Sequence, residues 1–361
     1  MPIHLTPPFK GGREGLLLLF IALLSACSPK PQVQTIDTAD QLQRFLQTMH
    51  RSDSLLFGQH DATLYGHAWS WLPDRSDCRD ITGEYPYIVS FDLGNLETGD
   101  SLSLDSVPFR LMAERMSEHH ARGGIVSVSW HPFNPIDGSD SWTVRTDTTV
   151  RALLPDGSEH ARLDTMLCRV ARFLQDLPCP VLFRPWHEQS GEWFWWGSKG
   201  CTREEYKALY RYTHDFLQQA CPNKIVWAYS PNYGISYEDY LAYYPGDDCV
   251  DLLGIDCYHF AHESVSTFQD HLRRSLDIVC RVAEEQGKIA ALTETGLESC
   301  VIPDWWTQTL LPVLQEYPLA YVLLWRNAYN MPHHFYVPYA GHPAADDFML
   351  FHNNPQILFV K

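Results

Sequence analysis

Eight short apolar segments recur along the chain, and they constrain its fold more than any other feature of the sequence. Most are near-continuously apolar and rich in β-branched or aromatic residues, which is typical of strands buried on both faces. They occupy residues 55–60, 86–92, 125–131, 181–187, 225–230, 252–258, 289–294 and 321–326. No glycine- or serine-rich linker divides the region that holds them, so we expect one domain.

Segments with helical spacing separate these strands. The longest predicted helices occupy residues 161–177, 202–220 and 267–286. Thr202 and Glu205 form a capping-box pattern at the start of the second helix, because each side chain can bond the other residue's backbone N–H. Strands that alternate with helices eight times predict an α/β fold of the (β/α)8 TIM-barrel type, which needs about 250 residues. An open doubly wound sheet is the alternative, but the first βα turn lacks the glycine-rich pattern that binds phosphates.

Polar side chains stand at the carboxyl ends of nearly all the predicted strands. In a barrel these ends meet at one rim, where active sites are built. The strand-end residues are His60, Asp92, Trp130, His131, His187, Glu188, Ser230, Asn232, Asp256, Tyr258, Glu294, Trp325 and Arg326. Because unpaired ionisable groups are costly to bury, so many of them at one rim indicate a functional site.

Two carboxylates of this rim suggest a reaction. Glu188 and Glu294 follow the predicted strands four and seven, on opposite sides of the barrel mouth. Glycosidic hydrolysis needs one carboxylic acid and one carboxylate, and retaining enzymes hold them about 5–5.5 Å apart. Either glutamate alone is as easily explained by a strand-end salt bridge. The pair, in a chain with 12 Trp and 18 Tyr that can stack on sugar rings, favours a glycosidase.

A longer run around Glu188 resembles a known family. Residues 184–197 (Arg-Pro-Trp-His-Glu-Gln-Ser-Gly-Glu-Trp-Phe-Trp-Trp-Gly) look like the acid/base segment of glycoside hydrolase family 26, best known for β-mannanases. Shorter matches occur at residues 58–60, 129–135, 293–296 and 325–328. The segment at 293–296, Thr-Glu-Thr-Gly, is similar to the family's nucleophile segment. The resemblance implies a retaining (β/α)8 barrel with catalytic glutamates on strands four and seven, in agreement with the strand count.

The resemblance also implies roles for individual residues. Glu188 would be the general acid/base and Glu294 the nucleophile, so the pKa of Glu188 should be raised towards the operating pH. Tyr258 and Arg326 are candidates to orient Glu294 by charge-assisted hydrogen bonds, although Arg326 is equally compatible with a structural ion pair. Substrate contacts are expected from His131, Asn134, His187, Trp193, Tyr258, Trp325 and Arg326. His60 either lines the floor of the site or caps strand one.

The expected reaction is hydrolysis of β-1,4-mannosidic bonds in mannan, galactomannan or manno-oligosaccharides by double displacement, with no cofactor or metal. Family 26 also includes β-1,3-xylanases and mixed-linkage β-glucanases, and no residue distinguishes these substrates. Residues 136–160 form a long connection after strand three, which we expect to block one end of the cleft and favour short products such as mannobiose.

Two other functional classes stay open at this stage. One is a metal-dependent hydrolase, although the sequence contains no HExxH motif or comparable ligand spacing. The other is a non-catalytic sugar-binding lipoprotein on the same barrel, which would usually lack one of the two glutamates.

The N-terminus predicts an export signal. Basic residues precede an apolar run at 16–24 that is too short to span a bilayer as a helix. The run ends in Leu-Ser-Ala-Cys, which resembles a bacterial lipoprotein box, so residues 1–27 would be the signal peptide and Cys27 the lipidated residue. Residues 28–45 would then be a tether and N-terminal segment, and residues 46–361 a single catalytic barrel.

The charge and the cysteine content limit which partners and which location we expect for this chain. A net charge of −17 repels phosphate backbones and anionic lipid, so we expect no nucleic acid partner and membrane contact only through Cys27. No acidic run follows Cys27, which favours an outer-membrane lipoprotein that faces the periplasm. We expect a monomer that binds a polysaccharide or oligosaccharide. Nine further cysteines leave at least one thiol unpaired, and Cys168 and Cys257 are expected to be buried.

Overall fold

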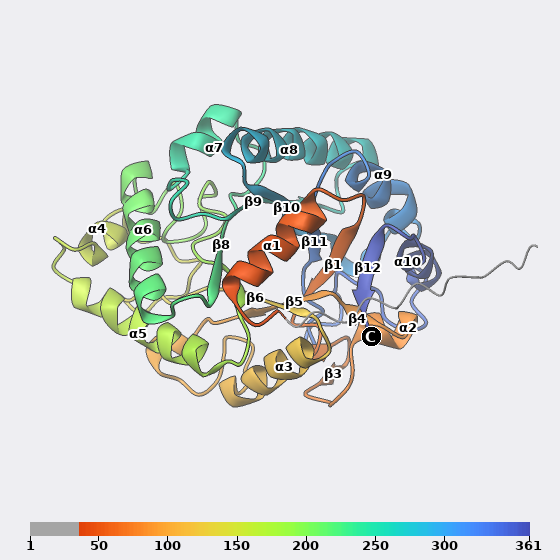
Figure 1. The fold of residues 1–361 in the computed structure, drawn as a ribbon, viewed down its shortest axis with the longest axis horizontal. Coiled ribbons are helices and arrows are strands. Elements are labelled where there is room, and N and C mark those ends of the chain that lie inside the picture. Colours follow the sequence, from red (N-terminus) through yellow and green to blue (C-terminus); the bar gives the residue numbers. More distant parts are fainter. Residues whose placement is uncertain (1–35) are drawn as a thin grey trace, which may run out of the picture. The chain divides into compact units, whose positions relative to one another are not determined.

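All eight predicted strands form, and they close into a barrel in the computed structural model, which describes residues 36–361 (Figure 1). The barrel strands are β1 (Leu55–His60), β5 (Ile88–Asp92), β6 (Ile125–Ser129), β7 (Val181–Arg184), β8 (Ile225–Tyr229), β9 (Leu252–His259), β10 (Ile289–Leu297) and β11 (Tyr321–Leu324). Each strand pairs in parallel with the next, and β11 pairs with β1 through the register Gly58 opposite Leu323. The closed parallel sheet confirms the (β/α)8 barrel and excludes an open sheet.

The strand ends differ from the predicted ones where functional side chains begin. The strands β6, β7 and β11 end two or three residues early, because the chain turns away from the ladder there to present residues at the rim. The strand β10 instead runs past Glu294 to Leu297. The apolar segment at 86–92 divides into β4 (Tyr85–Pro86) and β5, and β4 pairs antiparallel with β12 (Ile357–Val360) outside the barrel.

Helices surround the barrel on its outside (Figure 1). They are α2 (Asp77–Thr82), α3 (Phe109–Ala121), α4 (Thr149–Leu153), α5 (His160–Asp176), α6 (Arg203–Ala220), α7 (Tyr237–Tyr243), α8 (Val265–Gln286), α9 (Leu311–Leu314) and α10 (Ala345–His352). Short 3-10 or π turns occupy Leu96–Thr98, Glu298–Cys300 and Trp306–Leu310, and a two-stranded hairpin pairs β2 (Tyr65–Gly66) with β3 (Trp69–Ser70). The predicted capping box of α6 is confirmed, since Thr202 Oγ1 accepts from Glu205 N at 3.3 Å and Glu205 Oε2 accepts from Thr202 N at 2.9 Å.

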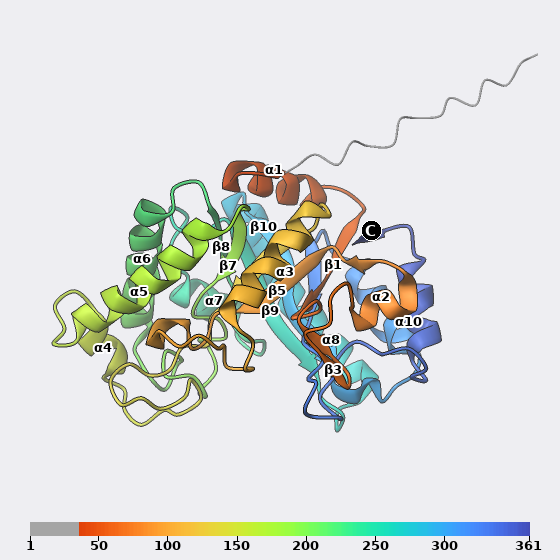
Figure 2. The ribbon, with the colours of Figure 1, turned by 90° about the horizontal axis from the view of Figure 1, so that it is seen from below.

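The barrel interior is apolar at one end and polar at the other. At the amino ends of the strands, inward side chains such as Leu56, Ile125 and Leu252 form one buried cluster. Helix α1 (Ala39–His50) lies across this end and buries Leu42 and Leu46 in the same cluster (Figure 2). With the amino end closed, the polar end remains for a site, in line with the usual position of barrel active sites.

Helix α1 crosses the predicted boundary at residues 45/46. Its apolar face is part of the barrel's core, so the described part of the segment at 28–45 is a structural element of the barrel rather than a tether. The predicted signal peptide at 1–27 and the predicted lipidation at Cys27 lie outside the described residues. Among residues 36–361, no helix has the length and apolar character that a membrane crossing requires.

The two cysteine predictions have different outcomes. Cys257 is buried as expected, but Cys168 is exposed, because it lies on the outward face of α5. Every cysteine among the described residues is a free thiol.

Candidate active site

Glu188 is held in a strained turn directly after β7. Trp186 and Glu188 both adopt left-handed backbone conformations, with φ of 53° and 54°, which non-glycine residues seldom adopt. The turn is fixed by a hydrogen bond from Glu188 N to Ser230 O at 2.8 Å and by burial of the Trp186 ring. Such strain persists only where the surroundings enforce it, and it commonly marks functional sites.

Glu294 is placed by an irregularity in β10. Leu292 pairs with Ile255, but the next paired residue is Glu294, opposite Asp256, so Thr293 is an extra residue in the strand. A bulge of this kind re-aims the side chains that follow it. Gly254 makes the bulge possible, because a Cβ at that position would lie 2.3 Å from Thr293 Cγ2. The bulge therefore brings Glu294 beside Asp256.

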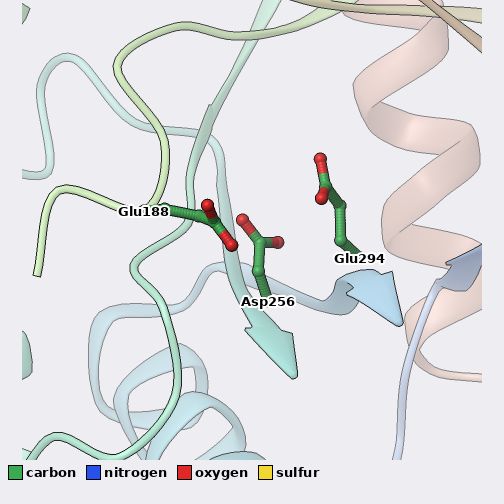
Figure 3. Close-up of side chains that lie close together, drawn as sticks. All are labelled: Glu188, Asp256 and Glu294. Atoms are coloured by element: carbon green, nitrogen blue, oxygen red, sulfur yellow. The ribbon is translucent and has the colours of Figure 1, made fainter. Parts of the chain in front are cut away.

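Three carboxyl groups meet at the rim (Figure 3). Glu188, Asp256 and Glu294 each offer an oxygen within 4.8 Å of the other two. Glu188 is half-buried, whereas Asp256 and Glu294 are buried. The separation of Glu188 and Glu294 is close to that of retaining glycosidases and shorter than the roughly 6.5–9.5 Å of inverting ones.

Arg184 and Tyr258 hold Glu294 in place. The buried Arg184 guanidinium forms ion pairs with Glu294 and with Asp256, the latter at 2.9 Å, and Tyr258 donates to Glu294 Oε2 at 2.6 Å. Tyr258 therefore contacts Glu294 as expected, whereas Arg326 does not and takes the other role left open for it, a structural ion pair. Arg326 forms an ion pair with Asp105 instead, because the chain leaves β11 at Leu324 and turns the guanidinium away from β10.

The electrostatics of the site separate the two glutamates. Burial, followed by the charges of Asp256 and Glu294, raises the pKa of Glu188 well above its ordinary value. Burial also raises the pKa of Asp256 to about 8, although the Arg184 charge opposes this. Glu294, in contrast, pairs with the Arg184 guanidinium and accepts from the Tyr258 hydroxyl, and these charge-assisted bonds hold its carboxyl group in place. The surroundings of Glu188 thus favour a bound proton, whereas those of Glu294 supply a cation.

The three carboxylates are close enough to share one cation, so a metal site must be considered. Carboxylate oxygens suit Mg²⁺ or Ca²⁺, which need about six ligands or more. Arg184 already places its guanidinium against two of the three carboxylates, and a bound cation would have to displace it or accept its repulsion. The donor set therefore fits an internal ion pair better than a metal.

The predicted polar contacts of strand three have a different role. His131 is buried, with Nδ1 at 2.6 Å from Asp92 and Nε2 at 3.1 Å from His187 Nε2, so both ring nitrogens are engaged by protein. Asn134 accepts from Ile136 N at 2.9 Å and donates to Thr149 Oγ1 at 3.3 Å. In this structure the polar atoms of Asn134 and His131 bond the loop and the neighbouring histidine, and the expected sugar contacts of both residues stay predictions.

Aromatic side chains border the carboxylates. Trp193 is 37% exposed and donates Nε1–H to Glu188 Oε2 at 3.0 Å. The half-buried Trp325 stacks on the buried His60 ring at 4.4 Å, so His60 supports the floor of the site. Trp142, from the connection after β6, is 51% exposed and stacks on His131 at 5.3 Å. Trp193 therefore offers a ring beside Glu188, and Trp325 and Trp142 offer rings over His60 and His131.

A comparison with known families adds to this geometry. The sequence profile of glycosyl hydrolase family 26 matches residues 30–306, more than half of the chain. The chain belongs to this family.

Several family 26 proteins are similar to this chain. A mannan endo-1,4-β-mannosidase from Bifidobacterium adolescentis is 34% identical over 259 residues, which are 67% of this chain and 25% of that protein. One from Bacillus subtilis strain 168 is 32% identical over 208 residues, 54% of this chain and 56% of that protein. The chain thus matches only a quarter to just over half of these relatives' lengths. A solved GH26 β-mannanase from Bacteroides ovatus is 44% identical, with a TM-score of 0.86 over 88% of this chain and 94% of that chain.

Sequence reasoning missed two residues of this family 26 site, Arg184 and Trp142, and placed Asp256 at the rim without a role. Arg184 interrupts an otherwise apolar strand, and a charged residue inside a buried strand is a usable signal. Trp142 gave no signal, because it lies in a polar connection with no periodicity. The neighbours Trp195 and Trp196 are both buried in the core.

Proposed function

We propose that this chain is a retaining glycoside hydrolase that cleaves β-1,4-mannosidic bonds, with Glu188 as general acid/base and Glu294 as nucleophile. The observation that carries the proposal is the pair of glutamates with oxygens within 4.8 Å, one in surroundings that favour a proton and the other paired with Arg184. Non-catalytic binding and metal-dependent hydrolysis would leave this asymmetry without a role.

The geometry accounts for each step of a double displacement. Glu188 donates its proton to the glycosidic oxygen while Glu294 attacks the anomeric carbon, and the bond to the leaving sugar breaks. The ionised Glu188 then takes a proton from water, whose oxygen displaces Glu294 from the sugar. Two inversions give a product with the original configuration. The raised pKa of Glu188 suits a group that must give up and regain a proton near neutral pH.

Mannan is the substrate that we propose, because the relatives at 32–44% identity are named as mannanases. The runner-up substrates are β-1,3-xylan and mixed-linkage β-glucan. The connection at 136–160 is the feature that supports the release of short products, since it carries the exposed Trp142, which stacks on His131. A ladder of long oligosaccharides at early times would contradict this part of the proposal.

The test is product analysis with mannohexaose, linear mannan and galactomannan, beside Glu188→Gln and Glu294→Gln. Wild type should release mannose or mannobiose with retained configuration by NMR, and both variants should lose nearly all turnover. Glu192→Gln is the matched control, because Glu192 lies in the same segment but is exposed. An inert wild type on mannan would move the assay to the runner-up substrates. Full activity in either glutamine variant at the rim would contradict the mechanism itself.

We also propose that residues 1–27 are a signal peptide, that Cys27 is lipidated, and that the barrel faces the periplasm as a monomer. The support is the order of basic residues, apolar run and Leu-Ser-Ala-Cys. Labelling with a fatty acid should mark the wild type and spare Cys27→Ser. Protease added to intact cells should leave the protein uncut, and cleavage would instead place it on the surface. Light scattering should give the mass of one chain.

A further inference from the structure

An exposed tryptophan stands on the hairpin that follows the first barrel strand. The hairpin pairs β2 with β3, and Figure 2 shows β3 at the end of the molecule opposite helix α1, which is the end that holds the candidate site. Trp71 and Leu72 come directly after β3 and are 43% and 44% exposed. Two large apolar side chains exposed next to each other indicate a surface that contacts another molecule.

Buried contacts fix the position of this hairpin on the barrel. The buried carboxylate of Asp77 accepts from His67 N at 2.7 Å and from Trp69 Nε1 at 2.6 Å. Asp77 also accepts from Asn327 Nδ2 at 2.7 Å, which joins the hairpin to the segment after β11. The His67 ring stacks on Tyr339 of that segment at 3.8 Å. The hairpin is therefore held at a defined place, although its tip is exposed.

The backbone of the hairpin is strained where the tryptophan is presented. Ala68, Trp71 and Asp74 adopt left-handed conformations, with φ of 61°, 61° and 53°. For a bulky residue such as Trp71 this conformation is an outlier, which a glycine would relieve. A hydrogen bond from Trp71 N to Leu64 O at 2.7 Å enforces it. Strain of this kind clusters at functional sites, so the exposed ring itself is the feature that needs a role.

A row of aromatic rings leads from Trp71 towards the candidate active site. The Trp71 ring lies 6.3 Å from the half-buried Tyr329 ring, which lies 5.6 Å from the ring of Tyr65. The Tyr65 hydroxyl accepts from Arg326 Nη1 at 3.2 Å. Arg326 directly follows Trp325, whose ring stacks on His60 at the floor of the site. The exposed hairpin is thus continuous with one wall of the site.

We propose that Trp71 and Tyr329 form a stacking surface that holds units of a β-mannan chain outside the catalytic centre. The inference rests on the proposed function for the identity of the polysaccharide. Aromatic rings offer apolar faces with a defined geometry, which suit the flat apolar face of a pyranose ring. A polysaccharide that extends beyond the catalytic centre must cross the adjoining surface. Because mannan is uncharged, the net charge of −17 does not repel it.

Trp71→Ala removes the stacking ring without touching the buried contacts of the hairpin. Among the described residues, the ring of Trp71 packs only against the ring of Tyr329, and the backbone bond to Leu64 O stays. Loss of one stacking contact should weaken the binding of polymer roughly 2- to 12-fold. Trp71→Phe keeps a flat ring and should retain most of the affinity. Leu350→Ala is the matched control, because Leu350 is 63% exposed on α10 and should not affect binding.

The experiment measures polymer binding apart from turnover. The full chain with Glu294→Gln, which should leave the polymer uncut, is run in native gels that contain galactomannan, alone and combined with each of the three variants. Galactomannan should retard the parent, Trp71→Phe and Leu350→Ala, and it should retard Trp71→Ala less. In the chain with Glu294 intact, Trp71→Ala should lower kcat/KM on galactomannan more than on mannotriose, since mannotriose offers few units beyond the catalytic centre.

Three results would overturn the stacking surface. The first is equal retardation of Trp71→Ala and its parent. The second is an equal loss of kcat/KM on galactomannan and mannotriose, because the ring would then only support the site. The third is light scattering that shows a dimer which Trp71→Ala dissociates, because the ring would then contact a second copy of the chain. If the wild type leaves mannan uncut, the proposed function fails separately, and the same gels with β-1,3-xylan or mixed-linkage β-glucan decide the surface.

Discussion

Arg184 carries a positive charge inside the barrel, and its removal should show what the ion pairs of the site contribute. The side chain is 2% exposed and donates to Asp256 at 2.9 Å, to Ser230 Oγ at 3.0 Å and to Glu294. Burial alone would lower the pKa of Arg184, but the charges of Asp256 and Glu294 outweigh it and raise the pKa above its usual range. Arg184→Met keeps most of the apolar stem and removes the charge.

The expected loss of stability follows from the number of charges left behind. Two buried carboxyl groups lose their shared cation, and breaking a buried ion pair costs about 3–5 kcal/mol. An unfolding entropy of about 2.1 cal/mol/K per residue gives a chain of 361 residues roughly 0.76 kcal/mol/K. The melting temperature should therefore fall by about 4–7 °C near neutral pH.

The pH dependence distinguishes lost charge from lost packing. The pKa of Asp256 is raised to about 8 in the folded protein despite Arg184, and without Arg184 it rises further. A carboxyl whose folded pKa exceeds the unfolded value of about 3.9 destabilises the fold increasingly as pH rises above that value. Below about pH 4 the carboxyl is protonated in both states and this cost disappears. Up to about pH 8 this cost is the same in both proteins, because Asp256 is protonated in the folded state of each; above pH 8 it levels off in the wild type and continues to rise in the variant. The contribution of Asp256 to the deficit of Arg184→Met should thus be small from about pH 4 to 7 and grow as pH rises from about 8 to 9.

Calorimetry of wild type and variant across this range is the assay. Arg211→Met is the matched control, because Arg211 pairs with Asp248 on the surface, where the two side chains are 43% and 67% exposed. An exposed pair contributes about 1 kcal/mol or less, so this control should melt within about 1–2 °C of wild type. The reasoning would be refuted by an Arg184→Met deficit that stays constant with pH, since only packing would then have been lost.

Three further outcomes are expected. Tyr258→Phe removes the 2.6 Å hydrogen bond to Glu294, so kcat/KM on mannohexaose should fall about 10- to 150-fold, and a change below threefold would count against an orienting role. Trp193→Phe removes the 3.0 Å hydrogen bond to Glu188, which lowers the pKa of Glu188 and so opposes the effect of burial. The basic limb of the pH profile of kcat/KM should therefore move to higher pH, and a move to lower pH would contradict this. Leu46→Ala in α1 should lower the free energy of unfolding in urea by about 2–5 kcal/mol, because Leu46 is fully buried at the closed end of the barrel. The substitution should leave kcat unchanged. An unaltered urea midpoint would show that α1 contributes little to the stability of the barrel.

The sequence by itself determined the architecture and the positions of Glu188 and Glu294 at the rim. Strands that are buried on both faces are near-continuously apolar, and this pattern is visible in the sequence alone, so all eight strands were predictable. The start of α6 at Thr202 was predictable as well. Glu188 and Glu294 were also predictable, because each follows such a strand and the carboxyl ends of parallel strands meet at one rim.

Only the tertiary structure decided which partners these glutamates have. The extra residue Thr293 sets Glu294 opposite Asp256, and this register depends on pairing between β9 and β10 rather than on either segment alone. Arg184 rather than Arg326 became the cation of the site, because the choice depends on where β7 and β11 end and which way the chain then turns. Strand burial is a local property of the sequence, whereas the direction and partner of a polar side chain depend on atoms contributed by distant segments.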